Sequence, residues 1–238
     1  MTRQARIGGV VLDGRPRAVA VVDRVLPAAR CAALRREGAD LVEVRADLFR
    51  EPLDRVAGFV LRLRRGSGLP LICTVRETRA NRAVRLRLFE RLLPLSDAVD
   101  IEVDTGIREE VIALAGGRTV IVSHHDFRAM PSDRHLRRIV DRAVAAGADI
   151  VKVAGMARSA GDAARLLAFC AASACPMVAI AMGPLGAVSR VVAPLFGSLF
   201  SYAFLRRAVA PGQLSLDQLT ADYRRFYPGR RRRTSRTS

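Results

Sequence analysis

The chain has 238 residues, half of them hydrophobic, and its 40 basic and 23 acidic side chains give a net charge of +17. This composition is sufficient for a full hydrophobic core and excludes a wholly disordered chain. Tryptophan is absent and only 5% of the residues are aromatic, which argues against a protein that binds single-stranded nucleic acid by base stacking. Among the basic residues only Lys152 is a lysine, and it lies in the apolar run Ile150–Ala154.

Lys152 is therefore the first candidate for a reactive side chain. An amine can lose its proton where burial and neighbouring cations lower its pKa, whereas the guanidinium of an arginine stays protonated. A lone lysine in a strand-like apolar run indicates a buried nucleophile.

The remaining composition favours a cytoplasmic protein without a metal site. No signal-peptide cleavage site follows the amino terminus. The 24 residues between Arg165 and Arg190 are uncharged, but Pro176 and Gly183-Pro184 divide them, so we expect buried core and no membrane span. The four cysteines form no C-x-x-C pair, which is typical of reduced thiols and not of disulfides or zinc ligands; they are Cys31, Cys73, Cys170 and Cys175.

Short β-branched runs alternate with longer amphipathic stretches along the whole chain. We predict strands at Ala18–Val22, Leu41–Arg45, Leu69–Arg76, Val99–Val103, Thr119–His124, Ile150–Ala154, Met177–Met182 and Leu199–Phe204. We predict helices at Pro27–Arg36, Pro52–Arg64, Arg82–Leu93, Arg108–Ala115, Ser132–Ala146, Ala160–Ala174, Gly186–Leu195 and Leu216–Phe226. Ser132 and Ser215 occupy positions suited to helix N-caps, and Gly147 one suited to a helix C-terminus.

Eight strands, each followed by a helix at intervals of roughly 25–30 residues, predict a single-domain α/β fold, the (β/α)₈ TIM barrel. A doubly wound open sheet is the alternative, disfavoured because no G-x-G-x-x-G turn follows the first strand. We assign the barrel to residues 1–228 and an Arg-rich, disordered tail to residues 229–238. The five arginines of the tail could attract nucleic acid, but no groove-reading motif accompanies them, so a solvated end is the simpler interpretation.

Polar residues at the carboxyl ends of the predicted strands mark the candidate site. Active sites of such barrels lie at these ends, and alternate strand residues face the interior. Five consecutive strands carry such residues: Glu43, Arg45 and Asp47; Arg76; Asp100, Glu102 and Asp104; Ser123 and His125; and Lys152.

Each of these residues also has a structural explanation. Glu43 with Arg45, or Glu102 with an arginine, could form an ion pair that lines the barrel. His125 could be a hydrogen-bonded core histidine, and Lys152 could extend to solvent from a strand end. We prefer the ion-pair explanation for the remaining carboxylates, Asp47, Asp100 and Asp104.

Taken together, these residues favour chemistry on a carbonyl group. Burial close to Arg45, Arg76 or Arg190 would lower the pKa of Lys152 and free its amine as a nucleophile. His125, one strand away, could transfer protons. Lysine with histidine indicates an imine intermediate, and the arginines indicate an anionic substrate. Class I aldolases and Schiff-base dehydratases fit this pattern equally well.

Several motifs in order resemble those of the type I 3-dehydroquinate dehydratases, the Schiff-base-forming enzymes of the shikimate pathway. The resemblance runs from about Ile7 to Phe226. It rests on Glu43-Val44-Arg45-Ala46-Asp47, Thr74-Val75-Arg76, Ser123-His124-His125-Asp126-Phe127, Asp149-Ile150-Val151-Lys152-Val153-Ala154, Met182-Gly183 with Gly186 and Ser189-Arg190, and Ala210-Pro211-Gly212-Gln213.

The resemblance implies a (β/α)₈ barrel, often a homodimer, that needs no metal or organic cofactor. Its small anionic substrate would be 3-dehydroquinate, and its products 3-dehydroshikimate and water. Lys152 would condense with the C3 ketone. His125 would assist imine formation, take the C2 proton and deliver it to the departing C1 hydroxyl.

The resemblance also implies which residues bind the substrate. Arg190 and Gln213 would hold the carboxylate and nearby oxygens, with Arg190 in the bidentate geometry that carboxylates favour. The ring hydroxyls and the carbonyl region would contact Glu43, Arg45 and Arg76. Met182 would pack against the ring.

Two positions depart from the family pattern. Ala80 stands where the family has a glutamate that partners the histidine, and we consider Glu77 or Glu102 as its replacement. Val209 stands where the family has a serine on the substrate lid, which removes a hydrogen bond worth about 1 kcal/mol. One alternative is therefore a divergent member with impaired activity or with another cyclic hydroxy-keto acid as its substrate. A remote alternative is a basic nucleic-acid-associated protein that has kept the barrel.

Overall fold

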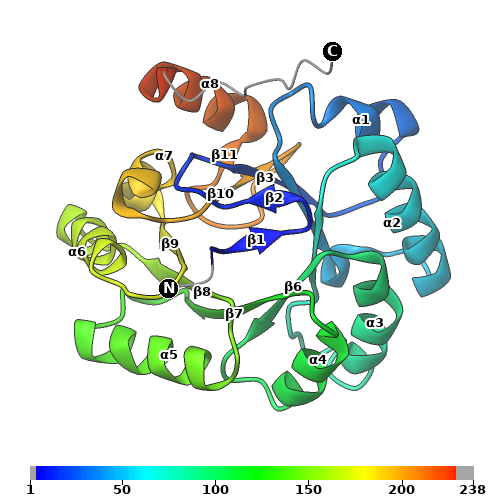
Figure 1. The fold of residues 1–238 in the computed structure, drawn as a ribbon, viewed down its shortest axis with the longest axis horizontal. Coiled ribbons are helices and arrows are strands. Elements are labelled where there is room, and N and C mark those ends of the chain that lie inside the picture. Colours follow the sequence, from blue (N-terminus) through cyan, green and yellow to red (C-terminus); the bar gives the residue numbers. More distant parts are fainter. Residues whose placement is uncertain (1–3, 229–238) are drawn as a thin grey trace.

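A computed structural model describes residues 4–228, so the predicted tail at 229–238 lies outside the described residues. Nine parallel strands form one curled sheet with helices around it (Figure 1). Their order is β11-β10-β3-β4-β5-β6-β7-β8-β9. The strands are β3 (Ala18–Val22), β4 (Leu41–Arg45), β5 (Leu71–Thr74), β6 (Ala98–Glu102), β7 (Thr119–Asp126), β8 (Ile150–Met156), β9 (Met177–Met182), β10 (Ser201–Phe204) and β11 (Leu214–Ser215).

The sheet curls until β9 meets the segment that leads into β10. Met177 forms a parallel bridge with Ser198, and Leu199 N donates to Met177 O over 2.9 Å. The predicted single-domain (β/α)₈ architecture is therefore confirmed.

The helices that cover the sheet follow the predicted order. They are α1 (Ala28–Ala33), α2 (Leu53–Ser67), α3 (Arg85–Leu92), α4 (Arg108–Ala115), α5 (Asp133–Ala145), α6 (Ala160–Ala171), α7 (Ser189–Val192) and α8 (Leu216–Phe226). Short 3₁₀ turns occupy Ala46–Leu48, Leu93–Leu95, Pro184–Gly186 and Ala193–Phe196. The Ser132 and Ser215 side chains cap α5 and α8, and Gly147 has a φ of +91° directly after α5. These three sequence signals are confirmed.

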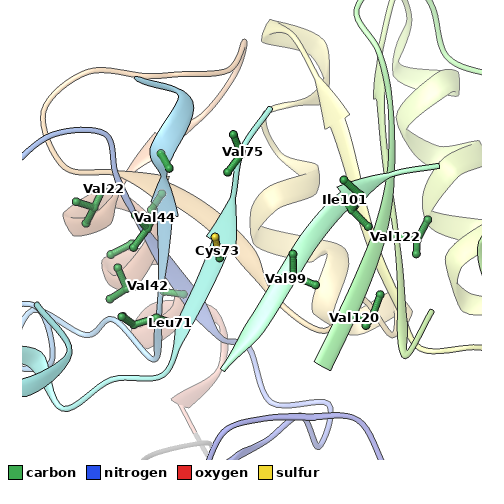
Figure 2. Close-up of a cluster of buried hydrophobic side chains, with 14 of the residues drawn as sticks. Val22, Val42, Val44, Leu71, Cys73, Val75, Val99, Ile101, Val120 and Val122 are labelled. Carbon is green, nitrogen blue, oxygen red and sulfur yellow. The ribbon is translucent and has the colours of Figure 1, made fainter. Parts of the chain in front are cut away.

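Alternation along each strand separates two hydrophobic cores. One core lies between the sheet and the helices and contains Val42 and Val44 of β4 and Val120 and Val122 of β7 (Figure 2). The other fills the barrel, with Leu41 and Ile121 among its members. Because strand side chains alternate between faces, Glu43 and Arg45 of β4 and Ser123 and His125 of β7 share the interior side with the second core.

An amino-terminal hairpin, which the sequence analysis did not predict, covers the amino ends of the strands. Its strands β1 (Arg6–Ile7) and β2 (Val10–Val11) pair antiparallel and cross the barrel in Figure 1. Thr119 Oγ1, at the start of β7, donates to Arg6 O over 2.6 Å. Ile7 is fully buried in the interior core. The hairpin therefore closes the barrel opposite to the carboxyl ends of the strands.

The uncharged segment between Arg165 and Arg190 contains the second half of α6 and the whole of β9, which confirms its interpretation as α/β core. In the described part of the chain, no helix is both long and apolar enough to cross a membrane.

The hairpin should contribute measurably to stability. Replacing Ile7 by alanine leaves a cavity at the closed end of the barrel, so the free energy of unfolding should fall by about 2–5 kcal/mol in urea denaturation. The half-buried Val10 of the same hairpin provides the control, because Val10→Ala should cost clearly less. Equal losses for the two variants would show that Ile7 does not close the core.

Candidate active site

The eight residues predicted to form the site line one pocket at the carboxyl ends of the strands. The pocket encloses about 90 Å³ and also contacts Phe127, Ala154, Ile180, Tyr202, Val209 and Ala210. The eight are Glu43, Arg45, Arg76, His125, Lys152, Met182, Arg190 and Gln213. A larger hollow of about 640 Å³ lies at the amino end of the barrel, but its lining includes no lysine or histidine.

Lys152 lies in the middle of β8 and is only 4% exposed. Its Nζ donates to Asp100 Oδ2 over 2.7 Å and lies 3.9 Å from Glu43 Oε1. The nearest charged groups are therefore carboxylates instead of the arginines that we expected. A buried ammonium requires a counter-charge, and Asp100 provides it.

Asp100 on β6, for which we preferred a structural ion pair, lies beside the candidate nucleophile. It is fully buried and accepts hydrogen bonds from Lys152 Nζ, from Ser123 Oγ over 2.6 Å and from Arg76 Nη2 over 3.3 Å. Burial alone would raise the pKa of Asp100, but the Lys152 and Arg76 charges outweigh it and hold the pKa well below its usual range. Asp100 is an ion-pair residue as expected, but its partner is the candidate nucleophile.

Further ion pairs fix the basic side chains around the pocket. Arg45 pairs with Asp47 through two contacts of 3.0 and 2.7 Å, so the alternative pairing with Glu43 is wrong. Arg76 contacts Glu102 at 3.1 Å in addition to Asp100. Although burial opposes its charge, these carboxylates raise the pKa of Arg76 above its usual value.

His125 lies near the end of β7, where its ring stacks on Phe127 at a centroid distance of 6.2 Å. Its Nδ1 is buried and has no hydrogen-bond partner within residues 4–228. Burial lowers the pKa of His125 well below the ordinary histidine value, and the positive charges of Arg76 and Lys152 lower it further. The imidazole is therefore neutral at neutral pH and can accept a proton.

Among residues 4–228, no carboxylate forms a hydrogen bond with His125 in place of the expected glutamate. Ala80 lies in an exposed turn. Glu77 bonds to Arg85, and Glu102 bonds to Arg76 and Arg85. Neither glutamate forms a hydrogen bond with His125 in the described part of the chain, so our hypothesis that one of them takes this role was wrong. Both are already engaged by arginines.

The loop before β11 closes the pocket and is held by Arg190. This α7 residue is 2% exposed, and it donates through Nε to Gly212 O over 2.8 Å and through Nη2 to Pro211 O over 3.1 Å. Gly212 has a φ of +70°, and a Cβ there would lie 2.4 Å from Gly183 O. Only glycine fits this close approach.

Arg190 carries a buried charge without a carboxylate partner among residues 4–228. Burial lowers its pKa to about 10. Because the loop carbonyls use Nε and one hydrogen of Nη2, the edge formed by Nη1 and Nη2 is left for an anion. Nearby, Val209 N donates to Gln213 Oε1 over 2.9 Å, which leaves the Gln213 amide nitrogen available to a ligand.

The neutral state of His125 predicts how stability depends on pH. A histidine whose pKa is lower in the folded chain binds its proton only after unfolding, so stability falls as pH decreases below the unfolded value of about 6.5. Between about pH 7 and pH 5, the wild type should lose more stability in urea titrations than His125→Gln, by on the order of 1 kcal/mol. Parallel pH profiles for the two proteins would contradict a neutral His125.

Comparisons with known proteins agree with this geometry. The family model described as type I 3-dehydroquinase matches residues 21–228. The 3-dehydroquinate dehydratase of Methanococcoides burtonii is 36% identical over 225 residues, covering 90% of this chain and 96% of that protein. That of Methanocella arvoryzae is 38% identical over 216 residues, covering 87% and 95%.

Solved structures show the same fold. The 3-dehydroquinate dehydratase of Aquifex aeolicus superimposes with a TM-score of 0.77 at 29% identity, covering 89% of this chain and 99% of that one. The type I enzyme of Clostridium difficile gives a TM-score of 0.84 at 24% identity, covering 96% and 100%. With the family model matched over most of the barrel, the chain belongs to the type I 3-dehydroquinase family.

Proposed function

We propose that this protein converts 3-dehydroquinate to 3-dehydroshikimate and water through an imine on Lys152, with His125 as general acid and base. Family membership supports the overall reaction. The observation that carries the mechanism is a buried lysine, held by Asp100, in the same pocket as a neutral histidine. No metal or organic cofactor enters the proposal, because the iminium itself is the electron sink.

The first step replaces the ketone oxygen by nitrogen. Lys152 gives one proton to His125 and attacks the C3 ketone as the free amine. His125 then returns the proton to the former ketone oxygen, which leaves as water while the C=N bond forms. One positive charge is present before and after the step. It starts and ends on the nitrogen that lies 2.7 Å from Asp100, so the carboxylate stabilises the iminium as it stabilised the ammonium.

The second step removes the C2 proton and then the C1 hydroxyl. His125 takes the proton, and the C2–H electron pair flows into the iminium to give an enamine. The enamine then expels the C1 hydroxyl, which leaves as water with the proton that His125 returns. Hydrolysis of the imine releases 3-dehydroshikimate and regenerates Lys152, so the net reaction is the loss of one water molecule.

The remaining pocket residues hold the substrate. Arg190, which has no carboxylate partner among residues 4–228, would bind the substrate carboxylate through its free edge, with the Gln213 amide donating beside it. The ring hydroxyls would contact the polar wall formed by Glu43, Arg45 and Arg76, and Met182 would pack on the ring. The homodimer implied by the family resemblance stays a prediction.

The single lysine makes the imine straightforward to test. Incubation with 3-dehydroquinate followed by borohydride reduction should give one mass adduct on the peptide that contains Lys152. Lys152→Ala should lose both adduct and turnover, and Lys152→Arg, which keeps a positive charge opposite Asp100, provides the control for folding. The amino terminus is the other amine that could be reduced, and its peptide serves as an internal control.

Two outcomes would contradict the proposal. Unchanged turnover in Lys152→Ala without an adduct would exclude the imine mechanism. Faster turnover of a related cyclic hydroxy-keto acid than of 3-dehydroquinate would favour the divergent-substrate alternative instead.

A further inference from the structure

Tyr202 on β10 has a buried hydroxyl group that no sequence motif identified. The residue is 4% exposed and lines the pocket beside Lys152. Its Oη is buried and has no hydrogen-bond partner in the described part of the chain, residues 4–228. Buried polar atoms are nearly always paired in folded proteins, so an unpaired one in a pocket calls for a partner that binds there.

Packing alone does not explain the hydroxyl. Two residues earlier on the same face, Phe200 is fully buried in the interior core and meets the Tyr202 ring edge-on at 5.5 Å. A second phenylalanine would fill the space of the Tyr202 ring without burying a polar atom.

Tyr202 lies beside Lys152, on the side of the pocket opposite to His125. Lys152 Nζ lies 4.0 Å from the centre of the Tyr202 ring. In the barrel, His125 comes from β7 on one side of β8, whereas Tyr202 comes from β10, which is reached on the other side through β9. Tyr202 and His125 therefore flank Lys152 from opposite directions.

With Lys152 between them, His125 and Tyr202 would face the substrate carbons on either side of the imine carbon. If Lys152 bonds to C3 and His125 faces the C2 proton, the carbon on the far side of C3 is C4, which carries a hydroxyl in 3-dehydroquinate. Burial, together with the negative charges of Glu43 and Asp100, raises the pKa of Tyr202 well above its usual value. The phenol therefore stays protonated and can donate. The pocket wall at Val209 offers only an apolar side chain.

We propose that Tyr202 is a substrate-binding residue whose hydroxyl donates a hydrogen bond to the C4 oxygen, and so selects ketones with an oxygen next to the imine carbon. The inference rests on the proposed function, because the orientation of the ring follows from the imine at Lys152.

The test compares Tyr202→Phe with a matched variant outside the pocket. Tyr227 is also buried, but its hydroxyl donates to Val191 O over 2.8 Å. Tyr202→Phe should raise KM for 3-dehydroquinate by about three- to tenfold, the effect of one lost hydrogen bond, and leave kcat within about twofold. Its Tm should stay the same or rise. Tyr227→Phe should lower Tm and leave KM unchanged.

A substrate lacking the C4 hydroxyl identifies the bonded oxygen. With the 4-deoxy analogue, wild type and Tyr202→Phe should have the same KM, because the bond is absent in both. If Tyr202→Phe has the wild-type KM for 3-dehydroquinate, the inference is overturned. It is also overturned if Tyr202→Phe has a lower Tm than the wild type and raises KM for the 4-deoxy analogue as much as for 3-dehydroquinate. Failure of the proposed function would instead abolish the turnover and the imine adduct of the wild type.

Discussion

The ion pair between Lys152 and Asp100 is the interaction on which the site depends. The two groups lie on β8 and β6, and Ser123, on the strand between them, donates to the same carboxylate. Removing both charges from water is costly unless their geometry and remaining hydrogen bonds compensate. Arg76 supplies another bond to Asp100. The curvature of the barrel brings the Lys152, Ser123 and Asp100 side chains of three consecutive strands together at one buried position, and the ion pair depends on this arrangement.

The other buried cations of the pocket are also balanced by carboxylates, except Arg190. Arg45 and Arg76 each have carboxylate partners that neutralise them. Arg190 has backbone carbonyls instead, and it fixes the loop that closes the pocket. A cation buried in this way gains most from an anionic ligand, because no carboxylate of the described chain competes for it. The charge distribution thus agrees with the proposed carboxylate substrate, whose anionic end would lie beneath the loop.

Periodicity predicted most of the fold because the strands and helices are long enough to show it. Helices α4 and α8 have the predicted bounds, and the eight barrel strands appear in order. The β1–β2 hairpin was missed because strands of two residues have no periodicity. Gly8-Gly9 between Ile7 and Val10 was the available signal, since such a pair favours a tight hairpin turn.

The side chains of the site were predicted more completely than their partners. Strand parity and motifs located eight of the fourteen residues that line the pocket. Pairing across a barrel depends on register and on side-chain length, which sequence spacing does not give. Asp100 was therefore separated from Lys152. Glu77 and Glu102 were considered for His125, although Arg85 engages both. Tyr202 was not singled out, because its place in an apolar strand is that of an ordinary core aromatic. Its hydroxyl, which has no hydrogen-bond partner among residues 4–228, distinguishes it.

The most direct test of this account is the rate of imine formation in Asp100→Asn, measured by borohydride trapping on protein whose circular dichroism matches the wild type. An amide keeps the shape of Asp100 but cannot balance the charge on the Lys152 nitrogen. Because hydrogen bonds to charged groups are worth about 1.5–3 kcal/mol, trapping and turnover of 3-dehydroquinate should both fall by about tenfold or more. Wild-type rates in Asp100→Asn would contradict a site organised by this ion pair.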